Sequence, residues 1–338
     1  MAEEVRNRKV VLKRYVTGYP TEDDMEVVDG TIHLAVPAGL AAPAVLVKNL
    51  YLSCDAWMRG RMSKRDDVTT VVNDFVLGEA MRKVVESTHT DYQAGDLEYT
   101  LITHPSWLVK IQHTELPLSY YTGVLASEFV ISVVVSPNDV AGMSGLTAYA
   151  GFFDVCKPKP GEAVFVSAAS GAVGQLVGQL AKLAGCHVAL LLKTKLGFHD
   201  AINYKSEPDL GASLRLRFPD GIDTLDAALP LMRLRGRVAV CGMVSQYSLD
   251  DPGQGVRMRN LPWLVTRRVR MEGFNVDDYL ADKDYYRRFE EAMAGYLRDG
   301  RVTYLEDVVE GLENAPAALV GIFRGRNVGR QLIVVARE

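Results

Sequence analysis

A turn of small residues is the part of this chain whose residue types and spacing are best suited to bind a ligand. The turn has the pattern Ala169-x-Gly171-x-x-Gly174, a dinucleotide-binding fingerprint with alanine in the first place. Small residues let a backbone approach a ligand closely. A helix that begins directly after them points its unpaired N–H groups and its positive end at the same place. We therefore predict a site for an anion such as a dinucleotide pyrophosphate. The alternative is that the glycines serve only to pack a helix against a strand.

The segments on either side of the turn have the patterns that such a site requires. Ala163–Val166 is a continuous apolar run, which is typical of a strand buried on both faces of a parallel sheet. The stretch that ends at Leu183 has the spacing of an amphipathic helix. On the ligand-binding interpretation, a valine at Gly174 would abolish dinucleotide binding and leave the fold intact.

The pattern of apolar residues divides the chain near residue 142. Before this point, short alternating runs broken by Pro and Gly predict an all-β, barrel-like domain. After it, strands alternate with helical stretches, which is typical of a doubly wound parallel sheet. The expected strands are Lys9–Lys13, Thr31–Val36, Ala44–Leu52, Lys83–Ser87, Ala163–Val166, His187–Leu191, Ala201–Tyr204, Gly236–Gly242, Arg270–Phe274 and Gln331–Ala336, and the expected helices include Gly145–Phe153 and Lys283–Leu297.

The overall composition excludes several classes of protein. The 338 residues are 48% apolar and 24% charged, values that suit a globular protein with a sizeable core. The net charge of −4 provides no basic field for nucleic acid or an anionic membrane. Met1–Arg6 carries charge where a signal peptide is apolar, and no apolar run reaches the ~20 residues of a membrane span. These features predict a cytoplasmic protein that binds neither nucleic acid nor membrane.

The cysteines and histidines predict neither a metal centre nor a disulfide. Cys54, Cys156, Cys186 and Cys241 lie far apart and form no Cys-x-x-Cys pair, and none of the six histidines is placed to complete a zinc-binding set. We interpret the cysteines as reduced thiols of a cytosolic protein, some of them buried.

Several longer motifs resemble one family over nearly the whole chain, and they occur in the family's order. They are Asn49–Asp55, Pro117–Gly123, Gly145–Gly151, Ser167–Gly174, Val240–Tyr247 and Gly325–Gly329. These motifs resemble the zinc-independent branch of the medium-chain dehydrogenases/reductases. Within that branch the chain is similar to the plant NADPH-dependent 2-alkenal double-bond reductases, which are relatives of the prostaglandin and leukotriene reductases.

The resemblance implies an α/β fold with two domains. Residues 1–141 and 301–338 would form a GroES-like β-barrel domain that carries the catalytic function. Residues 142–300 would form a Rossmann domain, a doubly wound parallel sheet that binds NADP. The resemblance also implies a homodimer.

The reaction implied by the resemblance is the NADPH-dependent reduction of the carbon–carbon double bond of an α,β-unsaturated aldehyde or ketone. A hydride goes to the β-carbon of a small lipophilic substrate, and a proton follows at the α-carbon. Such chemistry requires a hydrogen-bond donor where the enolate charge develops, and no metal if that donor is well placed. Two alternatives remain open: a quinone reductase of the same branch, and a catalytically impaired member that lacks parts of the cofactor site.

The resemblance also assigns the site residues. Tyr247 is the catalytic candidate, with its hydroxyl near the enolate or the cofactor ribose, and Trp57 would line the substrate entrance. The residues implied to bind the cofactor are Ala169, Ser170, Gly171, Ala172, Val173, Gly174, Tyr204, Cys241, Tyr247, Phe274, Asn275, Val276 and Asn327. NADP is favoured over NAD because no acidic residue follows the strand that ends near Leu191. Alternatively, Tyr247 is a packed tyrosine at a strand end, and Tyr204 and Asn327 cap turns.

The chain departs from the family at several places. Trp57 stands where the family has tyrosine, and it would fill more of the entrance without a phenol hydroxyl. Residues 126–141 are an extra segment, whose core Phe129–Val135 is apolar and β-branched. Strand-sized pieces are missing within 78–83 and between Leu97 and Tyr99.

Two further gaps fall in the cofactor-binding half. The loop that carries a lysine for the 2′-phosphate is missing between Ala189 and Leu192. The strand and glycine turn that follow Gly221–Asp223 in the family are missing before Leu225. Losing a central strand leaves its neighbours with unpaired backbone groups.

Overall fold

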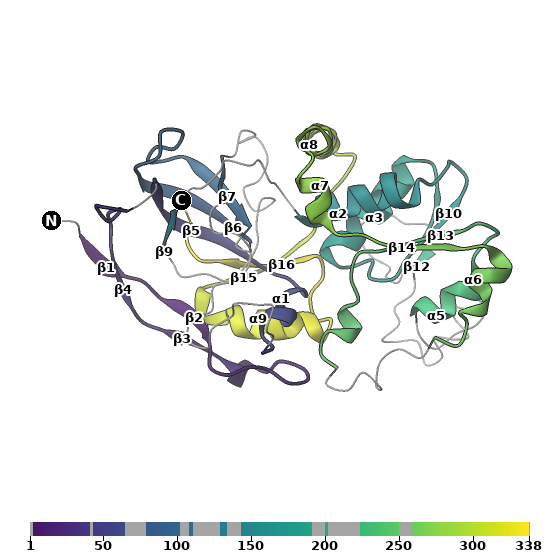
Figure 1. Cartoon of the computed structure of the whole chain (residues 1–338), viewed down its shortest axis with the longest axis horizontal. Helices are drawn as coiled ribbons and strands as arrows, with labels where there is room; N and C mark the ends of the chain where they lie inside the picture. The colour runs from purple at the N-terminus through teal and green to yellow at the C-terminus, as the bar shows by residue number, and fades with distance from the viewer. Residues whose placement is uncertain are drawn as a thin grey trace. The chain divides into compact units, whose positions relative to one another are not determined.

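The structure is a computed structural model in which the chain forms two compact units (Figure 1). It describes residues 3–40, 43–64, 79–101, 108–110, 129–133, 143–190, 200–201, 224–249 and 258–337. Unit 1 comprises Met1–Gly142, Tyr247–Asp250 and Glu306–Glu338, and unit 2 comprises Met143–Gln246 and Asp251–Leu305. Among the described residues, no helix is long and apolar enough to cross a membrane.

Unit 1 is built on one sheet that joins both ends of the chain. Its strands follow the order β15 (Glu306–Glu310), β16 (Arg330–Val334), β5 (Ala44–Cys54), β6 (Glu79–Ser87), β7 (Leu97–Leu101) and β8 (Leu108–Lys110). All neighbours are antiparallel except β15 and β16. The β5–β6 ladder shifts register at two bulges, which is how a sheet curves towards a barrel.

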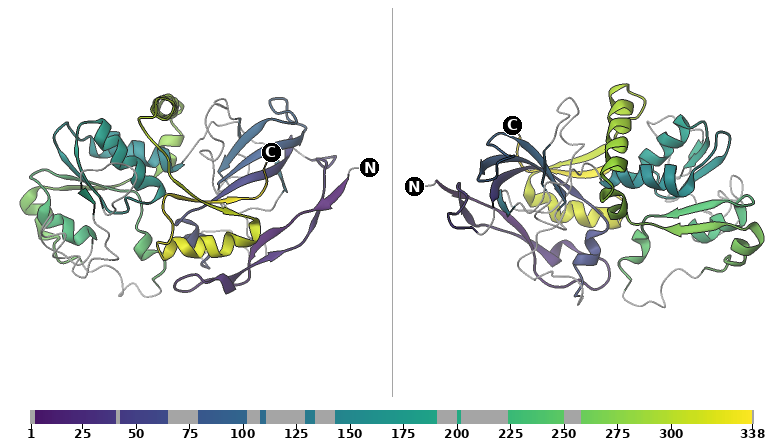
Figure 2. Two further views of the ribbon diagram at one scale, coloured as in Figure 1. Left: turned by 180° about the vertical axis from the view of Figure 1, so that it is seen from behind. Right: turned by 45° about the horizontal axis from the view of Figure 1, so that its top comes forward.

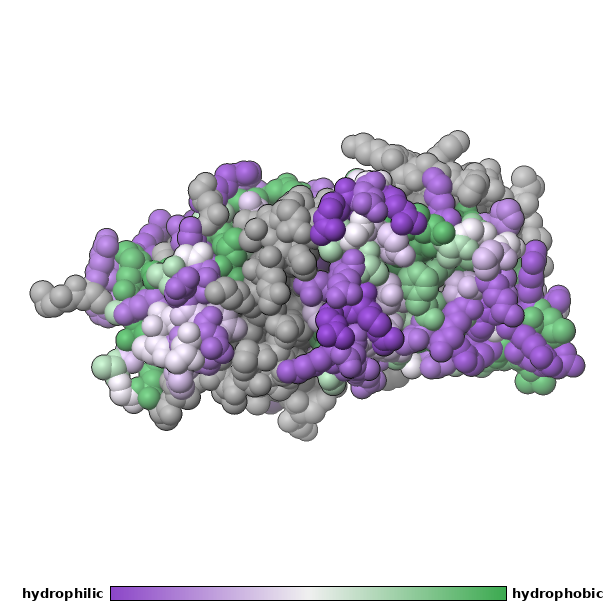
Figure 3. Space-filling view, turned by 90° about the horizontal axis from the view of Figure 1, so that it is seen from above, coloured by the Kyte–Doolittle hydropathy of each residue, from purple (hydrophilic) through white to green (hydrophobic). Residues whose placement is uncertain are grey.

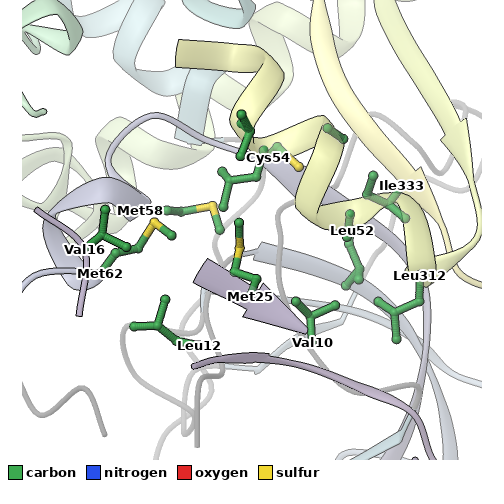
Figure 4. Close-up of a cluster of buried hydrophobic side chains, with 14 residues drawn as sticks. Val10, Leu12, Val16, Met25, Leu52, Cys54, Met58, Met62, Leu312 and Ile333 are labelled. Carbon is green, nitrogen blue, oxygen red and sulfur yellow. The ribbon is translucent and has the colours of Figure 1, made fainter. Parts of the chain in front are cut away.

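The core of unit 1 lies between this sheet and the short ladder of β2 (Lys9–Leu12) with β3 (Met25–Val28). A second short ladder, β1 (Glu4–Arg6) with β4 (Thr31–His33), is half-buried or exposed and contributes no residue to this core. Helix α9 (Ala315–Phe323), yellow in Figure 2, packs on β5 and β16. Figure 4 shows the buried side chains that meet there, among them Leu12, Leu52 and Ile333. The remaining short elements are η1 (Glu22–Asp24), α1 (Met58–Arg61) and η7 (Leu312–Asn314).

The extra segment contributes a strand to the sheet. β9 (Phe129–Val133) pairs antiparallel with Ala44–Lys48 at the beginning of β5. It lies along the same edge of β5 as β16, which pairs with the end of that strand. β16 reaches only Tyr51–Cys54, so β9 continues the sheet where β16 does not extend. The apolar, β-branched core of the insertion thus forms the secondary structure that its composition favours. Its flanks lie outside the described residues.

The two gaps predicted in the barrel half fall opposite each other. β6 and β7 pair across both of them, with Met81 opposite Tyr99 and Lys83 opposite Leu97. The ladder is therefore continuous at both positions where the sequence predicts missing pieces.

Unit 2 contains two groups of parallel strands with helices beside them. β10 (Ala163–Val166), β11 (His187–Leu190) and β12 (Asp200–Ala201) form one sheet, and β13 (Arg237–Val240) and β14 (Arg270–Gly273) form the other. Helix α2 (Met143–Ala150) continues as the π-helical turn η3 (Gly151–Cys156) and packs on α3 (Ala172–Leu183). The other helical elements are α5 (Thr224–Ala228), η4 (Leu229–Leu231), η5 (Val244–Gln246), α6 (Pro262–Arg267), α7 (Val276–Leu280) and α8 (Lys283–Arg298).

Helix α8 follows its predicted pattern. The Asp282 carboxylate accepts hydrogen bonds from the first backbone N–H groups, and Gly300 follows the helix in a left-handed conformation. Phe289 and Met293 are buried, whereas the charged residues face outwards and form part of the hydrophilic area near the middle of Figure 3. The predicted amphipathic helix is confirmed.

No strand of the described residues joins the two sheets of unit 2. In the described part of the chain, β10 pairs only with β11, and β13 pairs only with β14. Ala163 is exposed and the other residues of β10 are half-buried, so the prediction that this strand is buried on both faces is wrong. A parallel strand is buried on both faces only where helices or other segments cover both, and the described residues do not cover the side chains of β10 to that extent. The predicted strand loss before Leu225 falls next to residues 202–223, which lie outside the described residues.

An ion pair links the beginnings of β10 and β13. The guanidinium of Arg237 donates to the carboxylate of Glu162, which also accepts the N–H of Lys159. The hydrogen bond from Arg237, followed by that from Lys159, holds the pKa of Glu162 below its usual value.

We expect Arg237→Met to lower the free energy of unfolding by about 1 kcal/mol or less at pH 7, because both partners are partly exposed. A carboxylate with a lowered pKa stabilises the folded state above its unfolded-state pKa, and that contribution is lost as the pH falls through the folded-state value. The difference between wild type and variant should therefore shrink below pH ~4. Urea unfolding at pH 7 and pH 3 measures it. An equal difference at both pH values would contradict the role of this pair.

Candidate active site

The turn between β10 and α3 leads into a helix whose first backbone N–H groups have no partner within the helix. Gly171 precedes the helix, its N–H donates to the Ala168 carbonyl at 3.0 Å, and the first intrahelical bond joins the Gln175 N–H to the Gly171 carbonyl at 3.1 Å. The N–H groups of the residues between them have no acceptor within the helix. The first turn contains no acidic side chain. An anion at this point would therefore meet N–H donors and the positive end of a twelve-residue helix.

The two glycines of the fingerprint have different surroundings. A Cβ on Gly174 would lie 2.8 Å from the Ala169 Cα and would overlap the Ala168 carbonyl, so this position is needed for close contact between helix and turn. A Cβ on Gly171 would meet only the Ala168 oxygen, at an ordinary 3.4 Å. Gly174 thus serves to pack the helix against the turn. Gly171 is the glycine beside which the described residues leave space for a ligand. The side chain of Ala169 is itself buried.

A second group of predicted residues lies at the carboxyl ends of β13 and β14. Val240 is paired with Gly273, and the Phe274 N–H donates to the Val240 carbonyl at 3.2 Å, so Cys241 and Phe274 follow neighbouring strand ends. Carboxyl ends of parallel strands are where α/β sheets bind ligands.

The side chains of Phe274–Val276 have structural roles. The ring of Phe274 lies against Gly151, where a Cβ would approach it to 3.0 Å. The Asn275 side chain accepts the Asp277 N–H at 3.3 Å at the start of α7, and Val276 is buried. Contacts from this segment to a ligand would therefore come mainly from its backbone.

Three predicted residues belong to unit 1. Tyr247 follows η5 and is half-buried. Trp57 precedes α1, packs against the unit 1 core, and has the Arg61 guanidinium 5.9 Å from its ring centre. The Asn327 side chain donates to the Gly329 carbonyl at 2.8 Å, so it does cap a turn. The remaining candidate, Tyr204, lies outside the described residues.

A buried network beneath the Trp57 turn was not predicted. Arg330 at the start of β16 donates to the Ser53 hydroxyl at 2.8 Å, and that hydroxyl donates to the Asp55 carboxylate at 2.5 Å. The Asp55 carbonyl accepts the Met58 N–H at 3.2 Å, which begins the turn that carries Trp57. Ser53 and Asp55 lie within one motif and Arg330 directly follows another, but no local pattern indicates that the two motifs meet.

The described residues contain no group of His, Cys, Asp and Glu that could hold a metal ion. Cys54, Cys156, Cys186 and Cys241 are free thiols. Burial raises the pKa of the Cys54 thiol well above its usual value, so it stays protonated at neutral pH.

Comparisons with known proteins place the chain in a family. Residues 8–106 match the family described as the N-terminal domain of oxidoreductase. The chain is 49% identical to the NADP-dependent 2-alkenal reductase of Nicotiana tabacum over 100% of both chains. It is 43% identical to (+)-pulegone reductase of Mentha piperita, over 99% of this chain and 100% of that one. The crystal structure of CurA from Vibrio vulnificus in complex with NADPH is 28% identical and superposes with a TM-score of 0.76, over 98% of this chain and 100% of that one.

The chain belongs to the medium-chain dehydrogenases/reductases, and within them to the zinc-independent branch. The predicted fold class, a GroES-like β-barrel domain with a Rossmann domain, is confirmed. The alignment with the tobacco enzyme extends over 369 positions, more than the 338 residues of this chain. That enzyme therefore has residues without a counterpart here, in agreement with the gaps found in the sequence.

Proposed function

We propose that this protein is an NADP-dependent oxidoreductase that reduces the carbon–carbon double bond of α,β-unsaturated aldehydes or ketones. The observation that supports it most is an open strand–turn–helix site at Gly171 in a chain 49% identical throughout to an NADP-dependent 2-alkenal reductase. The second relative is named for an enone, pulegone, and CurA binds NADPH.

The residues of unit 2 are suited to hold the dinucleotide. Ala169–Gly174 would bind the pyrophosphate through backbone N–H groups at the start of α3, where no acidic side chain competes. Cys241 and Phe274–Val276 would lie beside the nicotinamide, and Tyr204 and Asn327 would contact the nucleotide. NADPH supplies a hydride when it is bound.

On the substrate side, we assign Tyr247 the hydrogen bond to the carbonyl oxygen, where negative charge develops as the β-carbon is reduced. Trp57 would limit the substrate to small lipophilic molecules. The hydrogen bonds among Ser53, Asp55 and Arg330 would hold the turn that carries Trp57 in place. We assign residues 1–141 and 301–338 to the catalytic domain and 142–300 to the cofactor domain. The relatives named above support a plant enzyme, and we place it in the cytoplasm.

The test is turnover of NADPH by the purified chain with a 2-alkenal, an enone and a simple quinone, together with thermal unfolding at millimolar NADPH. Reduction of the alkenal or enone supports the proposal, and turnover of the quinone alone would favour the quinone reductase. A ligand at 100 times its Kd stabilises a protein by about 2.7 kcal/mol. The absence of a thermal shift would therefore contradict both activities and favour the impaired member.

We further propose that the protein is a homodimer in which a second copy covers α6. Leu261 and Val265 of this helix are 43% and 79% exposed. The adjoining β14 pairs only with β13 among the described strands, so its other edge has no described neighbour. Exposed apolar side chains beside an open strand edge are typical of an association surface.

We expect Val265→Asp to convert the dimer to a monomer, because a charge would be buried in an apolar contact. Sedimentation velocity measures the change. Val308→Asp is the matched control, since Val308 is also an exposed valine but lies on β15 in unit 1. An unchanged dimer in the Val265 variant would contradict the interface.

A further inference from the structure

Two buried glutamines of α3 hold the segment Thr303–Leu305, which directly precedes β15, in the way that a neighbouring strand would. The Gln175 side chain donates to the Leu305 carbonyl at 2.9 Å and accepts the Leu305 N–H at 2.7 Å. The Gln179 side chain does the same for Thr303, at 2.8 and 2.7 Å. Each amide thus satisfies both backbone groups of one residue. We call this arrangement of Gln175, Gln179, Thr303 and Leu305 the glutamine clasp.

The spacing of the clasp follows from helix and strand geometry. Four residues of an α-helix rise about 6 Å, and alternate residues of an extended chain lie about 6.7 Å apart. Side chains at positions i and i+4 of a helix therefore reach residues j and j+2 of an extended segment. Gln175 and Gln179 are 1% and 7% exposed, and buried amides require partners of this kind. The Gln179 amide also donates to the Gln175 carbonyl at 3.0 Å, which ties the two halves together.

The clasp lies between the proposed cofactor turn and the end of unit 2. Gln175 lies in the first turn of α3, and its N–H donates to the carbonyl of Gly171 in the proposed pyrophosphate turn. Leu305 is the last residue of unit 2 before Glu306, which begins β15 in unit 1. The same glutamine therefore contacts the candidate cofactor turn and the point at which the chain leaves the unit.

We propose that Gln175 and Gln179 are positioning residues that couple NADP binding at the start of α3 to the ordering of Thr303–Leu305, an inference that rests on the proposed function. A ligand that fixes the first turn of α3 also fixes the Gln175 side chain, and through it the backbone of Leu305. Because coupling free energies are reciprocal, the intact clasp must in turn strengthen NADP binding.

Hydrogen exchange of the wild-type protein with and without NADP⁺ tests the proposal directly. The backbone N–H groups of Thr303 and Leu305 should exchange about tenfold more slowly when NADP⁺ is bound. Unchanged exchange at both amides, in a protein whose thermal shift proves that NADP⁺ binds, would overturn the clasp. The absence of NADP⁺ binding would instead overturn the proposed function.

A variant whose new side chain changes its protonation state with pH distinguishes a positioning role of Gln175 from a general loss of stability. In Gln175→Glu, an ionised carboxylate accepts the Leu305 N–H but repels its carbonyl, whereas the protonated acid can donate and accept as the amide does. We expect NADP⁺ binding to be about tenfold weaker than in wild type at pH 8 and to return towards the wild-type value as the pH falls to about 5.5. Gln93→Glu, at an exposed turn, is the matched control and should match wild type throughout. Equal affinity of the Gln175 variant and wild type at pH 8 would overturn the proposal.

Discussion

Replacing Gly174 with valine is expected to destabilise the protein by about 3 kcal/mol or more, whether or not cofactor is present. The atoms that a side chain would meet belong to the backbone of Ala168 and Ala169, and a backbone cannot rotate aside as a side chain can. The fingerprint by itself suggests lost dinucleotide binding with an intact fold, and the structure changes that expectation. Urea unfolding of the cofactor-free protein measures the loss. A stability close to that of wild type would contradict the close contact at this glycine.

Gly171→Ala is the matched variant. We expect it to weaken cofactor binding and to leave the free energy of unfolding nearly unchanged. The new methyl group meets one oxygen at 3.4 Å, and the backbone φ of −79° suits any residue, so the free energy of unfolding should change little. The methyl group would occupy the space in which the pyrophosphate approaches the turn. We expect the Kd for NADPH to rise about tenfold or more, which corresponds to about 1.4 kcal/mol. Titration of NADPH fluorescence measures it, and unchanged affinity would remove the turn from the cofactor site.

Tyr247→Phe is expected to lower kcat for a 2-alkenal by about 100-fold, the usual effect of removing one donor to a developing oxyanion. The affinity for NADPH should stay the same if the hydroxyl serves the substrate oxygen. A parallel rise in the Kd for NADPH would instead assign the hydroxyl to the cofactor ribose.

Steady-state kinetics and NADPH titration of the same preparation distinguish these outcomes. Tyr296→Phe is a suitable control, because Tyr296 lies on α8 beneath the Arg301 guanidinium and belongs to no proposed site. If kcat of the Tyr247 variant equals that of wild type, Tyr247 has no part in the reaction.

Much of the fold could be predicted because its signals are local. The spacing of apolar residues predicted α8 and the strand that became β14, and the small residues at 169–174 predicted the turn before α3. The β-branched core of the insertion has the composition that favours a strand, and Phe129–Val133 within it forms β9. The expected strand Thr31–Val36 is shorter, ending at His33, because strand ends depend on the available partner.

The sequence by itself determined the family, the two-part architecture and the residue types of the candidate site, since motif order and periodicity are properties of neighbouring residues. Only the tertiary structure brought Arg330 to Ser53 across 277 positions and Gln175 to Leu305 across 130. It also showed that Gly174 serves packing, whereas Gly171 has only the Ala168 oxygen close to it among the described residues. These features depend on how distant segments pack, and a contact between residues far apart in the chain is not reflected in the periodicity of either segment.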